Sequence, residues 1–273
     1  QGAGVMGYGM LFDMAGNDIY SAVDNAQGMC YAGVGMLYDL GGDDKFNARY
    51  AAQGSASFGT ALLFKANGND SYYCYYTGQG FGYTCGCGIL IDTGGDDRYV
   101  AEPYKLFNSS PENGHDAMRN YSFCQGAGWG QRDDTGRVSL AGGTGILQDL
   151  GGNDWYECGV YGQASGYWFG TGILHDKSGD DHYEGSFFVQ SGTAHMGLTY
   201  MLEEGGNDNY HIWHAISLGG AHDLSISYFI DKAGDDKFEC WEWKDVEGKQ
   251  TLEPTGTRDS GGGTLFGAGI TNA

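Results

Sequence analysis

One acidic motif recurs along the sequence and carries its clearest chemical signal. The motif reads Asp-x-x-Gly-(Asn/Asp)-Asp-x-(Tyr/Phe); its first position becomes Lys65 in the third copy and Glu203 in the seventh. Its second Asp lies at positions 18, 44, 70, 97, 154, 181, 208 and 236. Grouped carboxylates can bind Ca²⁺, or they can cap Gly-rich turns without metal. Both alternatives stay open. The candidate metal ligands are Asp39, Asp44, Asp70, Asp92 and Asp97, and Lys65 removes one ligand from its own copy.

A second group of polar residues lies where the repeat is interrupted. The interval from Tyr99 to Gln125 is 26 residues, whereas the matching interval from Tyr20 to Gln27 is 7, and the stretch after Gln125 is also lengthened. Carboxylates and imidazoles can act as general acids and bases, and a guanidinium group can neutralise an oxyanion or a uronate. The candidate catalytic residues are Glu112, His115, Asp116, Arg119, Asp133 and Asp134.

Aromatic residues recur four to five positions after a repeated glutamine. Such rows suit sugar rings, because the C–H faces of a sugar stack on aromatic rings. The alternative is a row that fills the core or covers one side of the molecule. The candidate substrate-binding residues are Tyr104, Trp129, Arg132, Tyr167, Trp168 and His195.

The spacing of the motif predicts the elements that must hold these residues. Successive second Asp residues are 26, 26, 27, 57, 27, 27 and 28 positions apart, and the glutamines at 1, 27, 53, 79, 125, 163 and 190 keep the same period. A repeat of about 27 residues is typical of a solenoid. Short apolar runs between Gly and Asp turns, with no helical periodicity, predict an all-β parallel β-helix of about eight to nine coils. We expect one domain over 1–273, with insertions at about 102–123 and 129–140 that wall a groove.

Stacked coils turn each repeated position into a ladder. We expect the aromatic residues of the motif to stack, and the glutamines to form either a self-satisfied amide ladder or a row of ligand-binding amides. The middle acidic position alternates strictly between Asn and Asp, and each Asp precedes a basic residue or histidine by two positions. This alternation predicts that each extra carboxylate pairs with its own cation.

Composition excludes several classes of function. The net charge of −21 makes nucleic acid an improbable partner, because phosphate binding needs clustered Lys and Arg. No apolar run approaches the length of a membrane span. The seven cysteines cannot all pair internally, and we expect buried thiols. The chain opens inside a repeat at Gln1, as expected of a mature protein or a piece of a larger one.

The solenoid pattern and the aromatic row beside the insertions resemble secreted parallel β-helix proteins that act on carbohydrates. This resemblance implies a secreted or cell-surface polysaccharide lyase or glycoside hydrolase acting at the inserted loops, with a polysaccharide or cell-surface glycan as partner. The Gly-Asn-Asp turn also resembles the Gly/Asp-rich RTX repeat, which implies Ca²⁺ sites. The alternative is a non-catalytic, Ca²⁺-stabilised surface or adhesion solenoid that binds glycan or protein.

Overall fold

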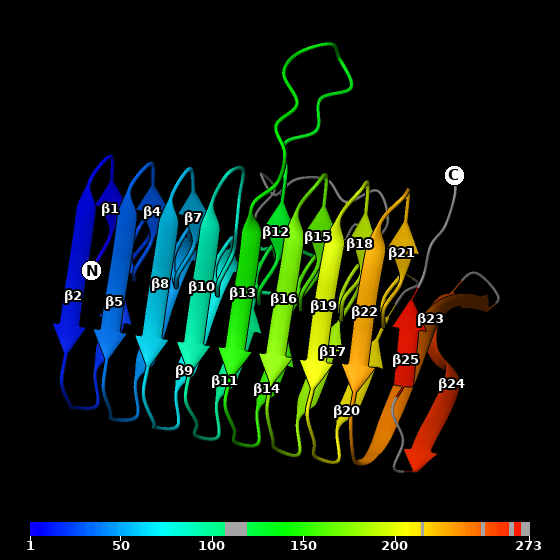
Figure 1. Ribbon diagram of the computed structural model, residues 1–273. Coiled ribbons are helices and arrows are strands. Elements are labelled where there is room, and N and C mark those ends of the chain that lie inside the picture. Colours follow the sequence, from blue (N-terminus) through cyan, green and yellow to red (C-terminus); the bar gives the residue numbers. More distant parts are fainter. Residues whose placement is uncertain (107–118, 214–215, 247–248, 262–264, 269–273) are drawn as a thin grey trace.

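The protein is a parallel β-solenoid, as the repeat spacing predicts. The computed structural model describes residues 1–106, 119–213, 216–246, 249–261 and 265–268, with side chains described as far as Cys240. Its coils stack side by side in one rod with three faces, which we call sheets A, B and C (Figure 1). Each coil contributes one strand to sheets B and C and, in most coils, a two-residue strand to sheet A.

Sheet B has nine strands, and the first eight are parallel and in register. They are β2 Tyr8–Asp13, β5 Val34–Asp39, β8 Thr60–Lys65, β10 Cys87–Asp92, β13 Thr144–Asp149, β16 Thr171–Asp176, β19 Leu198–Glu203, β22 Ile226–Asp231 and β25 Leu265–Ala268. Alternate residues face inward, so Leu37, Leu63 and Leu90 stack in a fully buried row. The last inward residue of each of the eight parallel strands is the first residue of a copy of the acidic motif.

Sheet C follows the acidic turn. Its strands are β3 Ile19–Ser21, β6 Lys45–Tyr50, β9 Ser71–Tyr76, β11 Arg98–Ala101, β14 Trp155–Glu157, β17 His182–Gly185, β20 Asn209–Ile212, β23 Asp235–Val246 and β24 Lys249–Gly261. The aromatic residues of the motif stack inside the rod with nearly parallel rings; the centroids of Tyr72 and Tyr99, for example, are 4.7 Å apart. The predicted aromatic ladder is therefore confirmed.

Sheet A consists of two-residue strands in two blocks. They are β1 Gly4–Val5, β4 Cys30–Tyr31, β7 Ala56–Ser57, β12 Gly128–Trp129, β15 Gly166–Tyr167, β18 Thr193–Ala194 and β21 Ala221–His222. Single parallel bridges from Gly82 to Ala56 and to Gly128 connect the blocks. Because β12 lies between the two insertions in the chain, sheet A carries the residues nearest to the interrupted repeat.

The glutamine row is structural, and it works differently from the predicted amide ladder. Gln53 is fully buried, and its Nε2 donates to the backbone oxygen of Phe46 at 2.9 Å and to that of Tyr73, one coil further on, at 2.8 Å. Gln27 and Gln79 make the same pair of bonds to carbonyls. Each amide thus ties its own coil to the next through the backbone and does not bond the neighbouring amide.

The alternating middle position also forms a ladder of its own. The backbone N–H of Asp43 donates to Asn17 Oδ1, and the N–H of Asn69 donates to Asp43 Oδ1. The prediction that each Asp pairs with the base two positions later is wrong for Arg98, whose described ion pair is with Glu157. His182 and Lys237 likewise pair with Glu184 and Glu239. Glutamates on the strand itself or on the neighbouring strand, and not the acids of the turn, are therefore the partners of these cations.

The C-terminal end departs from the parallel repeat. Strands β23 and β24 form a long antiparallel hairpin, and β25 pairs antiparallel with β22 (Figure 1). This arrangement covers the ladder edge of the last coil, which would otherwise offer unpaired backbone groups. Sequence periodicity could not predict it, because the motif has ended by Phe238.

Candidate functional site

An outer aromatic cluster lies alongside sheet A, outside the stacked inner core. It is built from residues two or three positions before and two or four positions after a glutamine of the repeat. Its buried members are Phe81, Phe123, Ala127, Val160, Tyr161, Phe187, Phe188 and Ala194. Trp129 and Tyr167 from β12 and β15 pack against it, with their rings stacked at a centroid distance of 3.9 Å.

The aromatic stack in this cluster ends at Phe123, and a pocket begins there. Phe188, Tyr161 and Phe123 occupy one position in successive coils and stack at 4.9 and 5.5 Å between centroids. The next two coils place Thr77 and Ala51 at that position, so no further ring fills the space. The resulting pocket has a volume of about 290 Å³. It is lined by Ala51, Ser55, Ser57, Tyr76, Thr77, Phe81, Tyr83, Phe123 and Trp129.

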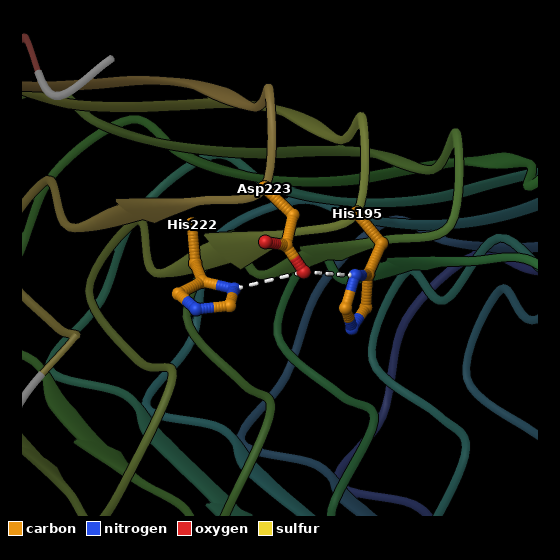
Figure 2. Close-up of side chains that lie close together, drawn as sticks. All are labelled: His195, His222 and Asp223. Carbon is orange, nitrogen blue, oxygen red and sulfur yellow. Dashed lines mark ion pairs between the residues drawn. The ribbon is translucent and has the colours of Figure 1, made fainter. Parts of the chain in front are cut away.

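Next to the outer aromatic cluster, at the other end of the row, lies a charged cluster. Figure 2 shows Asp223 between two imidazoles: its Oδ2 lies 2.6 Å from His195 Nδ1 and 3.1 Å from His222 Nδ1. Arg132, from the second insertion, places Nη1 2.8 Å from His195 Nε2 and its guanidinium 5.4 Å from the ring centroid of Trp168. The imidazole of His195 also meets the ring of Tyr167 edge-on. We call Arg132, His195, His222 and Asp223 the His–Asp cluster.

Hydrogen-bond chemistry fixes the protonation state of His195. A guanidinium can only donate, so Nε2 of His195 must be the unprotonated acceptor, and Nδ1 must carry the proton that Asp223 accepts. Burial lowers the pKa of His195, as does the positive charge of Arg132, while Asp223 opposes them. A metal ion on Nδ1 would move the proton to Nε2, directly facing Arg132. The His–Asp cluster therefore fits an oriented neutral imidazole better than a metal centre, although its three ligand atoms lie close together.

The predicted substrate-binding residues fall into two places. Trp129, Tyr167, Trp168, Arg132 and His195 lie together around the outer aromatic cluster and the His–Asp cluster. Tyr104 lies apart from them, against the guanidinium of Arg119 at 4.6 Å.

The predicted catalytic residues do not come together among the described part of the chain. Glu112, His115 and Asp116 lie outside the described residues. Arg119 is 6 % exposed and its guanidinium also lies over the ring of Trp213. Asp134 pairs with Arg132, and Asp133 accepts bonds from the backbone and hydroxyl of Thr135, which lower the pKa of Asp133. A carboxyl with a lowered pKa is a poor general acid.

The insertions contribute one arm to the site. The second insertion closes on itself through a bridge between Gln131 and Leu140 and projects from the rod beside β12 (Figure 1). Arg132 lies at its base, where it meets His195. The described ends of the first insertion are joined by an antiparallel bridge between Tyr104 and Arg119.

The predicted metal ligands lie in a buried acidic column that runs along the inside of the turns between sheets B and C. In six of the eight copies the first acid accepts a hydrogen bond from the tyrosine hydroxyl of the preceding coil, as in Tyr99 Oη to Asp149 Oδ2 at 2.6 Å. The second acid accepts the backbone N–H of the preceding second acid, as in Asp97 N to Asp154 Oδ1 at 2.6 Å. Burial raises the pKa of Asp97 to about 10 and that of Asp154 to about 9.

Sequence reasoning missed Asp223 as a member of the His–Asp cluster. The signal was present: Trp168, His195 and Asp223 each lie five residues after the glutamine position, which is Leu218 in the last coil. All three have a positive φ at the same corner. Including the position five residues after Leu218, next to His222, in the row would have found it.

Comparison with protein-family models, with curated proteins and with solved structures gives no match for this chain. The fold therefore defines its class, a parallel β-solenoid, from the structure alone. Among the described residues there is no helix long and apolar enough to cross a membrane.

Proposed function

We propose that this protein is a secreted or cell-surface β-solenoid that binds glycan at the outer aromatic cluster. The observation that carries the proposal is the end of the aromatic stack at Phe123, where a pocket replaces the next ring. A sugar ring placed there would continue the stack through its C–H face. The hydroxyls of Ser57, Thr77 and Tyr83 border the same space and supply polar partners for the sugar.

The charged end of the row extends this surface. Tyr167 connects Trp129 to His195 by ring contacts, so the pocket and the His–Asp cluster form one continuous strip. Arg132 provides a fixed positive charge on a chain whose net charge is −21. We therefore expect the strip to favour an acidic glycan whose carboxylate lies near Arg132.

The outer face of sheet B is the competing surface, and it fits a glycan less well. Its rows include Met36, Leu62, Ile89 and Ile146, which are partly exposed and apolar. A sugar needs hydrogen-bond partners for its hydroxyl groups as well as apolar contact, and the side chains of Met36, Leu62, Ile89 and Ile146 supply none.

Affinity measurements test the proposal. Titration calorimetry against a panel of neutral and acidic polysaccharides should detect binding that Trp129→Ala weakens at least tenfold. Trp155→Ala is the matched control, because Trp155 lies on sheet C against His182 and Arg98, away from the strip. Equal loss in both variants, or no binding to any polysaccharide, would contradict the proposal.

A second candidate function, polysaccharide lysis, rests on the His–Asp cluster. Abstraction of a proton next to a carboxylate requires a general base and a positive charge that neutralises the carboxylate. His195 supplies the base, because its Nε2 carries a lone pair and Asp223 orients the ring, and Arg132 beside it supplies the positive charge. Arg132 must then move from Nε2 to the substrate.

Product assays separate the two candidates. A lyase releases unsaturated uronate absorbance from acidic polysaccharides, and His195→Ala or Asp223→Asn would abolish it while binding remains. Binding without any product, either unsaturated or with new reducing ends, favours the non-catalytic binder.

A further inference from the structure

The acidic column repeats one arrangement of carboxylates from coil to coil. Ligand atoms of three acids lie within 4.8 Å of one another in each of several groups. These groups are Asp18–Asp39–Asp44, Asp70–Asp92–Asp97, Asp97–Asp149–Asp154 and Asp154–Asp176–Asp181. Each group joins the first acid of one coil to the second acids of that coil and the one before.

Three of these groups, those that include Asp97 or Asp154, contain at least one oxygen without a hydrogen-bond partner. The Oδ1 atoms of the second acids accept backbone N–H groups, but the Oδ2 atoms of Asp97, Asp154 and Asp181 are buried and accept none. These residues are at most 3 % exposed. An ionised oxygen removed from water without a partner is strongly unfavourable, so the arrangement requires a positive charge or a proton at this point.

The third coil shows that the fold can accommodate a positive charge at this point. Here Lys65 replaces the first acid. Its fully buried ammonium lies between the second acids of two successive coils, 3.2 Å from Asp44 Oδ2 and 3.3 Å from Asp70 Oδ2. Its Nζ also contacts the carbonyl oxygens of Gly42 at 2.8 Å and Asn67 at 2.6 Å. The chain itself therefore places a cation inside a cage of carboxylate and carbonyl oxygens.

The neighbouring aromatic residue changes together with Lys65. In the other described pairs a tyrosine hydroxyl donates to the first acid of the next coil, as Tyr72 does to Asp92. Before Lys65 that aromatic is Phe46, which has no hydroxyl to leave unpaired against an ammonium. The two positions of this pair thus change together: Phe46 replaces the tyrosine and Lys65 replaces the acid.

We propose that the all-acid groups bind Ca²⁺ inside the turns, and that the Lys65 ammonium takes the ion's place in the third coil. The all-acid groups offer carboxylate oxygens, and carbonyl oxygens also border the equivalent space around Lys65; both are ligands that Ca²⁺ prefers. Thiolate or imidazole ligands, which would select a softer metal, are missing from these named groups. The ion would be structural, joining each coil to the one before it.

Ion counting tests this proposal without any glycan, so it stands or fails independently of the proposed function. Elemental analysis of the purified protein after equilibration with Ca²⁺ should find at least three Ca²⁺ per chain, and EGTA should lower the melting temperature by more than 10 °C. Asp154 belongs to two groups, so Asp154→Asn should remove one to two ions. Less than one ion per chain with an unchanged melt in EGTA would overturn the proposal, because protons would then hold the column.

A gain-of-site variant gives the sharper test. Phe46→Tyr combined with Lys65→Asp restores the tyrosine–acid pair and should add one Ca²⁺ per chain. Lys237→Asp is the matched control: the Lys237 side chain is 48 % exposed outside the column, so the count should not change. An unchanged count in a folded double variant would contradict the role of Lys65, and if that variant fails to fold, the wild-type ion count and EGTA melt still decide.

Discussion

The contacts of a single residue in this solenoid depend on the residues one coil away. Gln53 illustrates it: its position in an axial row could be predicted from the period, but its partners could not, because an amide can bond either an amide or a carbonyl one strand away. The left-handed backbone at the glutamine position, with φ of 53° for Gln53, turns the amide toward the carbonyls of Phe46 and Tyr73. A sequence without coordinates contains no information on that angle.

His195 gives a testable pH dependence at the same scale. The groups facing it are Arg132, Asp134, His222, Asp223 and the ring of Tyr167. Because burial and Arg132 lower its pKa in the folded state, the unfolded chain takes up a proton first as the pH falls. The stabilisation from neutral His195 is therefore complete above the ordinary histidine pKa of about 6.5 and is lost as the pH falls below it.

Melting curves check this prediction. Between pH 8 and pH 5 the melting temperature of the wild type should fall further than that of His195→Gln, which keeps a neutral polar group without the titration. Histidine chemical shifts followed by NMR should place the midpoint of His195 below 6.5. A midpoint above that value would show that Asp223 outweighs Arg132 and burial.

The secondary structure of the repeat could be predicted from the sequence more fully than the structure of the insertions. The period of about 27 residues, the short strands and the inner aromatic ladder follow from spacing alone, because stacked coils force identical positions into register. The placement of Trp129, Tyr167 and His195 along one edge follows from the same rule. The base of the second insertion does not, since Arg132 reaches His195 through a loop outside the repeat, and the antiparallel β23–β24 hairpin begins where the motif ends.

The acidic turn owes its close stacking to one glycine. A Cβ at Gly95 would lie 1.5 Å from the backbone oxygen of Gly68 in the preceding coil, and the φ of Gly95 is +145°. Gly95→Ala should therefore push two coils apart and cost at least 2–3 kcal/mol, at the upper end of single substitutions.

The matched control is Gly7→Ala, where the nearest atom to the added Cβ is 3.7 Å away and the backbone is not left-handed. Urea unfolding monitored by circular dichroism should show a large shift in midpoint for Gly95→Ala and almost none for Gly7→Ala. Similar midpoints for the two variants would mean that the turns are free to move apart.

For the whole molecule, the distribution of charge matters more than its sum. The net charge is −21, and the structure buries many of the acids that contribute to it. The buried acids of the column are Asp39, Asp44, Asp70, Asp92, Asp97, Asp149, Asp154, Asp176, Asp181, Glu203, Asp208, Asp231 and Asp236. Within this column Lys65 is the one buried cation among the described side chains, and it lies at the end of β8, the third strand of sheet B.

This asymmetry predicts that the rod loosens unevenly when Ca²⁺ is removed. Coils of a solenoid contact only their neighbours, so they open locally with free energies set by their own interfaces. The coils around Lys65 keep a positive charge between Asp44 and Asp70 in EGTA, whereas those from Asp149 to Tyr183 keep none.

Hydrogen exchange followed by mass spectrometry should therefore show full protection of both regions in Ca²⁺. In EGTA, peptides covering 149–183 should exchange at least tenfold faster, while peptides covering 60–76 change little. Equal acceleration in both regions would mean that the ammonium of Lys65 does not replace the ion.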